Sequence, residues 1–105
     1  MEVSVLIAAY NAANTIERAI RSIPDCVPRI LVLDDCSTDA TASIVQALGD
    51  ARVRLIKHPH NMGIGAARQS LLSSCLTDYG IWLDADDMLL PGHVESLLEI
   101  LQGGA

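Results

Sequence analysis

Short apolar runs alternate along this 105-residue chain with segments whose apolar residues recur every three or four positions. The short runs are typical of β-strands, and a spacing of three and four is typical of helices that bury one face. The strands are predicted at residues 3–8, 30–33, 52–56 and 80–83. The helices are predicted at about 14–23, 38–48, 64–76 and 91–103.

This β-α-β-α-β-α-β-α order predicts an α/β fold, a Rossmann-like open sheet of parallel strands with helices packed on its faces. Residues 52–56 alternate apolar and polar side chains more than the other strands do. Alternation is typical of a strand with one wet face, so we expect this strand at an edge of the sheet. The chain has the length of one domain.

Local signals predict how the first two helices begin. Asn14, followed three residues later by Glu17, has the spacing of a capping box. Ser37, Thr38 or Asp39 is expected to cap the second helix. In the last helix, Pro91 is expected in the first turn, and the inward stripe is expected to consist of Val94, Leu97, Leu98 and Leu101.

The negative charge of the protein is concentrated in two short segments. Thirteen acidic and seven basic residues give a net charge of −6. Six aspartates account for the excess: Asp34, Asp35, Asp39, Asp84, Asp86 and Asp87. Each group follows a predicted strand, as Tyr10 and Asn11 do. Ligands of open α/β sheets bind where the parallel strands end, so we expect all these residues on one rim.

Composition excludes several classes of protein. The acidic balance and the presence of only three aromatic residues argue against a nucleic-acid partner. No apolar run approaches the roughly 20 residues of a transmembrane helix, and the first residues lack the basic region of a signal peptide. Three widely spaced cysteines form no disulfide framework, so we expect a reducing, cytoplasmic location.

Other side chains are expected to have structural roles. Cys26 and Cys75 are expected in or near the core, and Trp82 is expected to pack in a buried strand. Cys36 is expected to be a small buried residue, with a reactive thiol as the alternative. The histidines lack the spacing of metal ligands and are expected on the surface or in loops. They are His58, His60 and His93.

The second acidic segment places three carboxylates within four residues, at Asp84, Asp86 and Asp87. Their mutual repulsion favours a bound cation, and carboxylate oxygens suit Mg²⁺ or Mn²⁺, often together with substrate phosphates. The alternative is a solvated acidic loop in which Asp87 helps to start the last helix. The residues alone leave both interpretations open.

Two other segments are candidates for binding a nucleotide. A carboxylate such as Asp34 or Asp35 can accept a hydrogen bond from an imide N–H like that of uracil. Gly63 and Gly65 would let backbone N–H groups approach an anion at a helix start, and Arg68 could then reach a phosphate. The alternative for this second segment is a flexible turn, with Arg68 on a solvated helix face.

Four segments together resemble the nucleotide-binding half of the GT-A glycosyltransferases of the inverting family 2. They are the strand and turn at 3–11, the Asp-Asp-Cys-Ser-Thr-Asp loop at 34–39, the Asn-x-Gly segment ending in Ala-Arg at 61–68, and Asp-Ala-Asp-Asp at 84–87, which is similar to the family's DXD motif. The resemblance spans nearly the whole chain and implies strand order 3-2-1-4. It also implies that a nucleotide-diphospho-sugar donor, with a preference for uridine, and Mn²⁺ or Mg²⁺ are bound for transfer of a sugar to an acceptor hydroxyl with inversion.

The resemblance implies roles for individual residues. The implied nucleotide-binding residues are Ala8, Tyr10, Asp34, Asp35, Arg68 and Asp84, and the implied metal ligands are Asp86 and Asp87. Tyr10 and Asp35 would contact the base, Asp34 would support that pocket or the ribose, and Arg68 would lie near the nucleotide or its phosphates. How Asp84, Asp86 and Asp87 divide ribose and metal contacts stays open.

The chain also departs from the family pattern. Ala8 stands where the family usually has proline, Cys36 where it has glycine and Gln69 where it has asparagine. The family's general base comes from a later acceptor-binding half, and no residue here matches it. We therefore expect residues 1–105 to be one nucleotide-sugar-binding subdomain of a longer enzyme, inactive alone, with the base beyond Ala105. The longer protein could act at the cytoplasmic face of a membrane, on an acceptor that the sequence does not identify.

Two other classes of function are alternatives. One is a non-catalytic module that self-associates through apolar surface exposed by truncation. The other is a phosphotransfer domain, either a receiver or an aspartate-nucleophile phosphatase. The phosphotransfer interpretation is the weaker one, because Tyr10 and Asn11 stand where a receiver needs its acidic pair and little chain follows Asp87.

Overall fold

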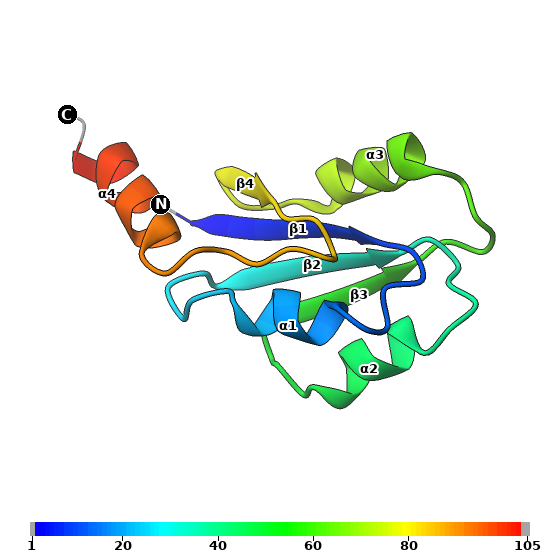
Figure 1. The fold of residues 1–105 in the computed structure, drawn as a ribbon. Helices are drawn as coiled ribbons and strands as arrows, with labels where there is room; N and C mark the ends of the chain where they lie inside the picture. The colour runs from blue at the N-terminus through cyan, green and yellow to red at the C-terminus, as the bar shows by residue number, and fades with distance from the viewer. Residues whose placement is uncertain (1, 104–105) are drawn as a thin grey trace.

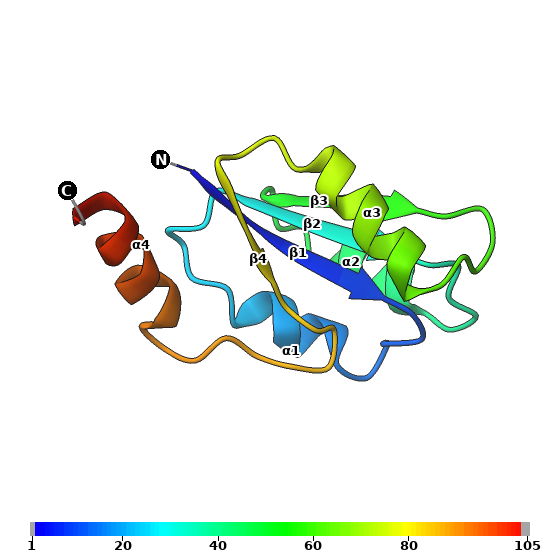
Figure 2. The ribbon, with the colours of Figure 1, turned by 90° about the horizontal axis from the view of Figure 1, so that it is seen from above.

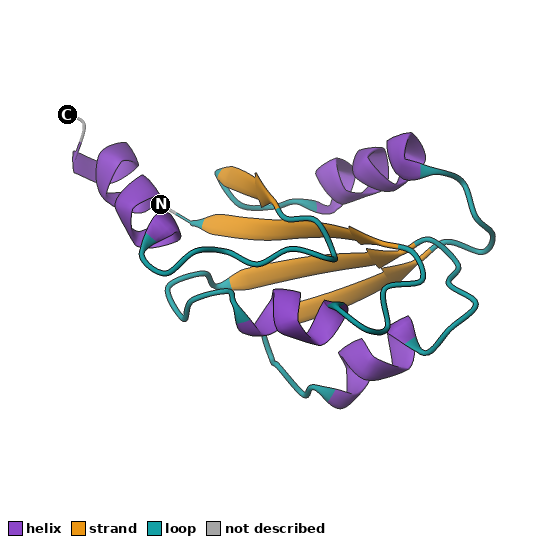
Figure 3. Cartoon of the chain, in the orientation of Figure 1, coloured by secondary structure: helices purple, strands orange, loops and turns teal. Residues whose placement is uncertain are grey.

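Strands and helices alternate throughout the computed structural model, which describes residues 2–103 (Figure 1, Figure 3). The strands are β1 Val3–Ala9, β2 Arg29–Asp34, β3 Val53–Lys57 and β4 Tyr79–Trp82. The helices are α1 Ile16–Arg21, α2 Thr41–Ala47, α3 Ile64–Ser74 and α4 His93–Gly103. The predicted order of elements is confirmed, and the boundaries differ from the predicted ones by a few residues.

The strands form one parallel sheet in the order β3-β2-β1-β4, which confirms the order implied by the family resemblance. β3 is an edge strand, as its alternating sequence predicts. Ala9 pairs with Asp34, and Asp34 pairs with Lys57. The loops after β1, β2 and β3 therefore leave the sheet at one level. We call this side, where Ala9, Asp34 and Lys57 end their strands, the carboxyl edge.

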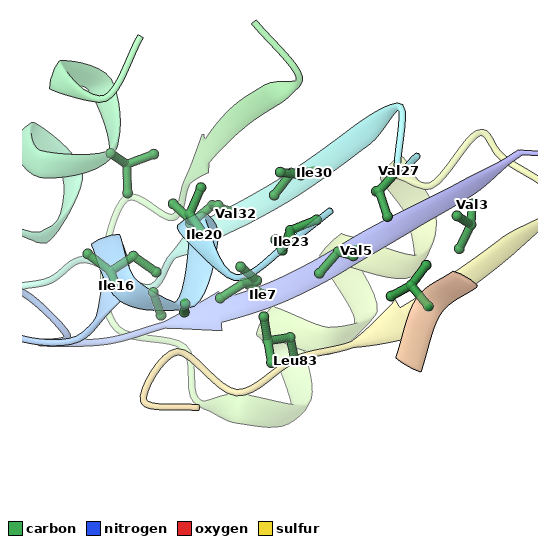
Figure 4. Close-up of a cluster of buried hydrophobic side chains, with 14 residues drawn as sticks. Val3, Val5, Ile7, Ile16, Ile20, Ile23, Val27, Ile30, Val32 and Leu83 are labelled. Carbon is green, nitrogen blue, oxygen red and sulfur yellow. The ribbon is translucent and has the colours of Figure 1, made fainter. Parts of the chain in front are cut away.

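Helices cover both faces of the sheet, with α1 and α2 on one face and α3 on the other (Figure 1). The larger core lies under α1 and α2, where Val5 and Ile7 of β1 gather with Ile20 of α1 (Figure 4). A smaller core under α3 contains Leu6 and Leu71, both fully buried. β1 is thus buried on both faces, which explains why its sequence is a continuous apolar run rather than an alternating one.

α4 lies beyond the amino-terminal end of β1, away from the carboxyl edge (Figure 1, Figure 2). Val94 is buried in the larger core, whereas the three leucines of the predicted stripe are only half-buried. Pro91 precedes α4 instead of lying in its first turn, because Gly92 has a φ of 80° and interrupts helical geometry there. No helix within residues 2–103 combines the length and apolar character needed to cross a membrane.

The predicted side-chain caps of the first two helices are only partly confirmed. The residue before α1 makes no side-chain cap, and Glu17 pairs with Arg21 at 2.7 Å instead of closing a capping box with Asn14. An exposed pair one helical turn apart is a favourable alternative for a glutamate in this position. Ser37 and Thr38 do not cap α2, because both are engaged by Asn11 of the loop after β1. Asp39, the third candidate, does accept the backbone N–H of Thr41, the first residue of α2, at 2.9 Å.

Three side chains expected in the interior lie on the surface. Cys26 and Cys36 are exposed, whereas Cys75 is half-buried near the smaller core as expected. Trp82 is 45% exposed, because β4 is an edge strand and its outer side carries no further strand among the described residues. The apolar pattern of 80–83 correctly predicts a strand but does not reveal that the strand lies at an edge.

Candidate functional site

Two neighbouring pockets lie at the carboxyl edge. The inner pocket has a volume of about 230 Å³ and is lined in part by Asp35. The outer pocket has a volume of about 460 Å³ and is lined in part by Asp84 and Asp86. Ala8 and Tyr10 line both pockets, so the two are adjacent. The structure therefore brings the two acidic segments to one rim, as the position of each after a strand predicts.

Asn11 joins the loop after β1 to the loop after β2. Its backbone has a φ of 50°, in the left-handed region that asparagine tolerates better than most residues. Its N–H donates to Oγ of Ser37 at 2.9 Å, and its Oδ1 accepts the backbone N–H of Thr38 at 2.8 Å. These contacts fix the loop that presents Tyr10, whose side chain is 48% exposed between the two pockets.

Asp34 and Asp39 hold loops rather than facing the pockets. Asp34 is buried, and its Oδ1 accepts the backbone N–H of Ser37 at 3.1 Å and also the Ser37 hydroxyl. Asp39 accepts the backbone N–H groups of Ala13 and Thr41, at 3.1 and 2.9 Å. The hydroxyl of Thr41 also donates to Asp39 and holds the pKa of that carboxyl below its ordinary value. Two of the three aspartates in the first segment thus stabilise the rim itself.

Asp35 is the carboxylate that lines the inner pocket, although its residue surface is only 5% exposed. Its Oδ1 lies 2.8 Å from Nδ1 of His58 and accepts the backbone N–H of Met62 at 2.9 Å. Its Oδ2 accepts the backbone N–H of Gly63 at 2.9 Å. Burial alone would raise the pKa of Asp35, but these hydrogen bonds outweigh burial and lower it. The group is therefore an anion at neutral pH.

His58 lies in a loop, as expected, but the sequence does not predict the partners of its side chain. Its side chain is 9% exposed and lies between Asp35 and Ser70 of α3, with Nε2 2.9 Å from the Ser70 hydroxyl. The only sequence signal for these partners is that His58 is a polar residue directly after an edge strand. This position becomes informative once Lys57 is known to pair with Asp34, because His58 and Asp35 then leave the sheet side by side. His60 and His93 are exposed, as expected.

The second acidic segment divides between two hollows. Asp84 and Asp86 are exposed and line the outer pocket, and Arg18 donates to the backbone oxygen of Asp86 at 3.2 Å. Asp87 lines a second hollow, which Asp84 also lines, and its Oδ1 accepts the N–H of Met88 at 2.8 Å. Within residues 2–103, no cluster of three or more His, Cys, Asp or Glu is arranged to hold a metal. Two carboxylates on one pocket instead fit a cation that takes its other ligands from phosphate oxygens.

The backbone N–H of Gly63, before α3, contacts a carboxylate of the protein itself. Gly63 has a φ of 90°, which side chains rarely adopt, and the anion that its N–H meets is the carboxylate of Asp35. Arg68 lines neither pocket, and its guanidinium lies over the ring of Trp82, 5.8 Å from the ring centre. This distance is within the range of a cation–π contact. Arg68 therefore stands beside the rim, against β4.

Cys36 has the backbone conformation expected of the glycine that it replaces. Its φ is 61°, in the left-handed region, and its side chain is exposed rather than buried. Its Sγ lies 3.8 Å from the backbone oxygen of Pro59. The turn therefore explains why glycine is usual at this position, because glycine adopts this φ without strain, and nothing in the structure explains the cysteine.

Comparisons with known proteins agree with this arrangement. The succinoglycan biosynthesis protein ExoO of Rhizobium meliloti is 39% identical over 101 residues, which cover 93% of this chain and 29% of ExoO. Among solved structures, S. aureus TarS 1–349 in complex with UDP superimposes with a TM-score of 0.89 at 24% identity, over 98% of this chain and 32% of TarS. This second likeness shows the fold.

A solved structure with higher sequence identity is glucosyl-3-phosphoglycerate synthase from Mycobacterium tuberculosis, solved with Mn²⁺, UDP and glucosyl-3-phosphoglycerate. It is 29% identical with a TM-score of 0.76, over 95% of this chain and 39% of the synthase. This chain thus spans about a third of the length of the proteins that it matches. The model of the family named Glycosyl transferase family 2 matches residues 4–105, and the chain therefore belongs to that family.

Proposed function

We propose that this chain binds the nucleotide-diphospho-sugar donor of a family 2 glycosyltransferase at its carboxyl edge. One observation carries the proposal: the inner and outer pockets adjoin through Ala8 and Tyr10, with one carboxylate in the first and two in the second. A nucleoside needs a small pocket with a specific polar contact, and a diphosphate needs a compensating cation nearby. The two pockets supply these features side by side.

The inner pocket suits the base. Oδ1 of Asp35 is engaged by two groups and Oδ2 by one, so Oδ2 retains capacity to accept a further hydrogen bond. An imide N–H, as in uracil, is a matching donor. Tyr10 offers an exposed ring against which a base can pack. Asp34 would support this pocket through the Ser37 loop, and the synthase solved with UDP supports a uridine donor.

The outer pocket suits the diphosphate and its cation. We assign Asp84 and Asp86 to this region, with Asp86 as the principal ligand of Mn²⁺ or Mg²⁺. Asp87 is assigned as a second metal ligand, which requires its loop to move toward the outer pocket. When bound, such a cation neutralises the charge that develops on the diphosphate leaving group. Arg68 stands at the side of the rim, where its charge would favour the anionic donor.

The remaining parts of the reaction belong to the longer protein in this proposal. The chain spans about a third of the relatives it matches. Transfer with inversion requires a general base for the acceptor hydroxyl, and we place that base outside residues 1–105. The 105-residue chain alone is expected to bind donor without transferring sugar. Its family also argues against a phosphotransfer domain.

Calorimetric titration of the 105-residue chain with UDP, with and without Mn²⁺, tests the proposal. We expect binding that Mn²⁺ strengthens by about tenfold or more, a difference of about 1.4 kcal/mol or more. Asp86→Ala should remove this strengthening. Asp25→Ala is the matched control, because Asp25 is an exposed aspartate in the loop before β2, away from both pockets. A folded protein that binds no UDP, or a Mn²⁺ effect that survives Asp86→Ala, would refute the proposal.

A further inference from the structure

Three side chains form a partly buried chain of contacts behind the inner pocket. Nδ1 of His58 lies 2.8 Å from Oδ1 of Asp35, and Nε2 of His58 lies 2.9 Å from Oγ of Ser70. Because Asp35 is an anion and can only accept, Nδ1 carries the hydrogen in this contact. His58 and Asp35 are 9% and 7% exposed in their side chains. The imidazole is therefore held at both ends.

The register of the sheet places these residues together. Lys57, the last residue of β3, pairs with Asp34, the last residue of β2. The residues that follow, His58 and Asp35, consequently start their loops side by side, and the backbone N–H of His58 donates to the oxygen of Asp34 at 3.0 Å. α3 lies across one face of the sheet (Figure 2), and Ser70 is in the middle of this helix. Three separate elements thus fix one imidazole.

The contacts determine how the Asp35 carboxylate is oriented. The terminal torsion of an aspartate is broad, so an unrestrained carboxylate rotates readily. Here His58 and Met62 both engage Oδ1, while Gly63 engages Oδ2. His58 is the only side chain among these three donors, so it is the one that a substitution can remove without altering the backbone of the loop. Oδ2 is the oxygen left with room to accept from a ligand in the inner pocket.

We propose that His58, held by Ser70, is a positioning residue that aims Oδ2 of Asp35 at the ring N–H of the base and thereby sets which bases bind. This inference rests on the proposed function of the inner pocket. Uracil and guanine present an imide-type N–H to such an acceptor. Cytosine and adenine present an unprotonated ring nitrogen at the same place, which would face the carboxylate lone pairs. A well-aimed Oδ2 therefore favours the first pair over the second.

The test compares nucleoside diphosphates that differ mainly in this group, UDP against CDP and GDP against ADP, each titrated with Mn²⁺. We expect the wild-type protein to prefer the imide-bearing member of at least one pair by about tenfold or more, the size expected for a hydrogen bond to a charged group. His58→Ala should reduce that ratio to within about threefold of unity, mainly by weakening the preferred ligand. His60→Ala, at an exposed histidine two residues along, should leave the ratio unchanged.

Two further variants separate positioning from general damage. The amide nitrogen of an asparagine side chain occupies the place of Nδ1, so His58→Asn should restore the ratio to within about threefold of the wild type. Ser70→Ala keeps the imidazole but frees its far end, and should lower the ratio by about threefold. If His58→Ala does not fold, these two variants carry the test.

The outcomes distinguish the inference from the proposed function. A wild-type protein that binds no nucleoside diphosphate refutes the proposed function and the inference with it. A wild-type protein that binds them without preference within either pair refutes the inference alone. The inference is also refuted if folded His58→Ala and Ser70→Ala keep the wild-type ratio, or if His58→Asn loses as much selectivity as His58→Ala.

Discussion

Arg52, the residue before β3, ties together two connections at the end of the sheet opposite the carboxyl edge. Its guanidinium forms a two-point contact with Asp50, with N–O distances of 3.1 and 2.9 Å. The same group donates to the backbone oxygens of Pro24 and Val27 at 2.7 and 3.2 Å. The Arg52 side chain is 22% exposed. One side chain therefore joins the α1–β2 loop to the α2–β3 turn.

We expect Arg52→Met to destabilise the fold by about 2–3 kcal/mol. A hydrogen bond to a charged group contributes about 1.5–3 kcal/mol. This substitution removes five such contacts, the fifth being a 3.5 Å hydrogen bond to the backbone oxygen of Ile23, and leaves partly buried acceptors without a donor. The contributions do not add fully, because the site is partly exposed and water can replace some of the contacts. Methionine retains most of the apolar stem of arginine, so the loss of stability measures the contribution of the guanidinium contacts rather than that of side-chain packing.

Urea unfolding followed by circular dichroism measures this loss. With a slope of about 1–3 kcal/mol per molar urea, the midpoint should fall by about 1 M or more. Arg54→Met is the matched control, since Arg54 is an exposed arginine two residues along, in β3, and should change stability by no more than about 0.5 kcal/mol. Equal midpoints for the two variants would show that Arg52 does not hold the loops together.

Two other predictions follow from the same structure. The hydrogen bond from Arg52 holds the pKa of Asp50 below its ordinary value, so its stabilisation is complete above that ordinary value and is lost as the pH falls through the native pKa. Asp50→Asn should therefore lower the urea midpoint at about pH 7, and this effect should shrink as the pH falls below the ordinary pKa of an aspartate; a difference independent of pH would contradict the assignment. Cys36→Gly should raise stability by about 1 kcal/mol, because it relieves a φ of 61°. Cys26→Gly, at another exposed cysteine, should not raise stability. Thermal unfolding of both variants tests this difference.

Much of the fold could be predicted because its signals are local. The apolar run of β1 indicates a strand buried on both faces, and the alternation at 52–56 indicates the edge strand that the structure has at Val53–Lys57. The rule that parallel sheets bind ligands where their strands end places Asp35 and Asp84 on one rim, and the pockets agree. None of this requires knowledge of which residues touch.

The errors concern residues whose surroundings come from distant parts of the chain. Ser37 and Thr38 have the composition of helix caps, but Asn11 engages both from another loop. Trp82 has an apolar sequence context, but its exposure depends on what lies beside β4. Cys36 is placed on the surface by the turn that its φ imposes. Periodicity within one segment carries no information about these partners.

The sequence by itself determined the alternation of strands and helices, the edge position of β3 and the two acidic segments at strand ends, because hydrophobic period and strand polarity are properties of short segments. Only the tertiary structure decided that Asp35 lines the inner pocket while Asp34 and Asp39 hold loops, and that His58 is buried between Asp35 and Ser70. These contacts join residues up to 23 positions apart. They depend on the register of parallel strands and the placement of α3 across them, which no local pattern encodes.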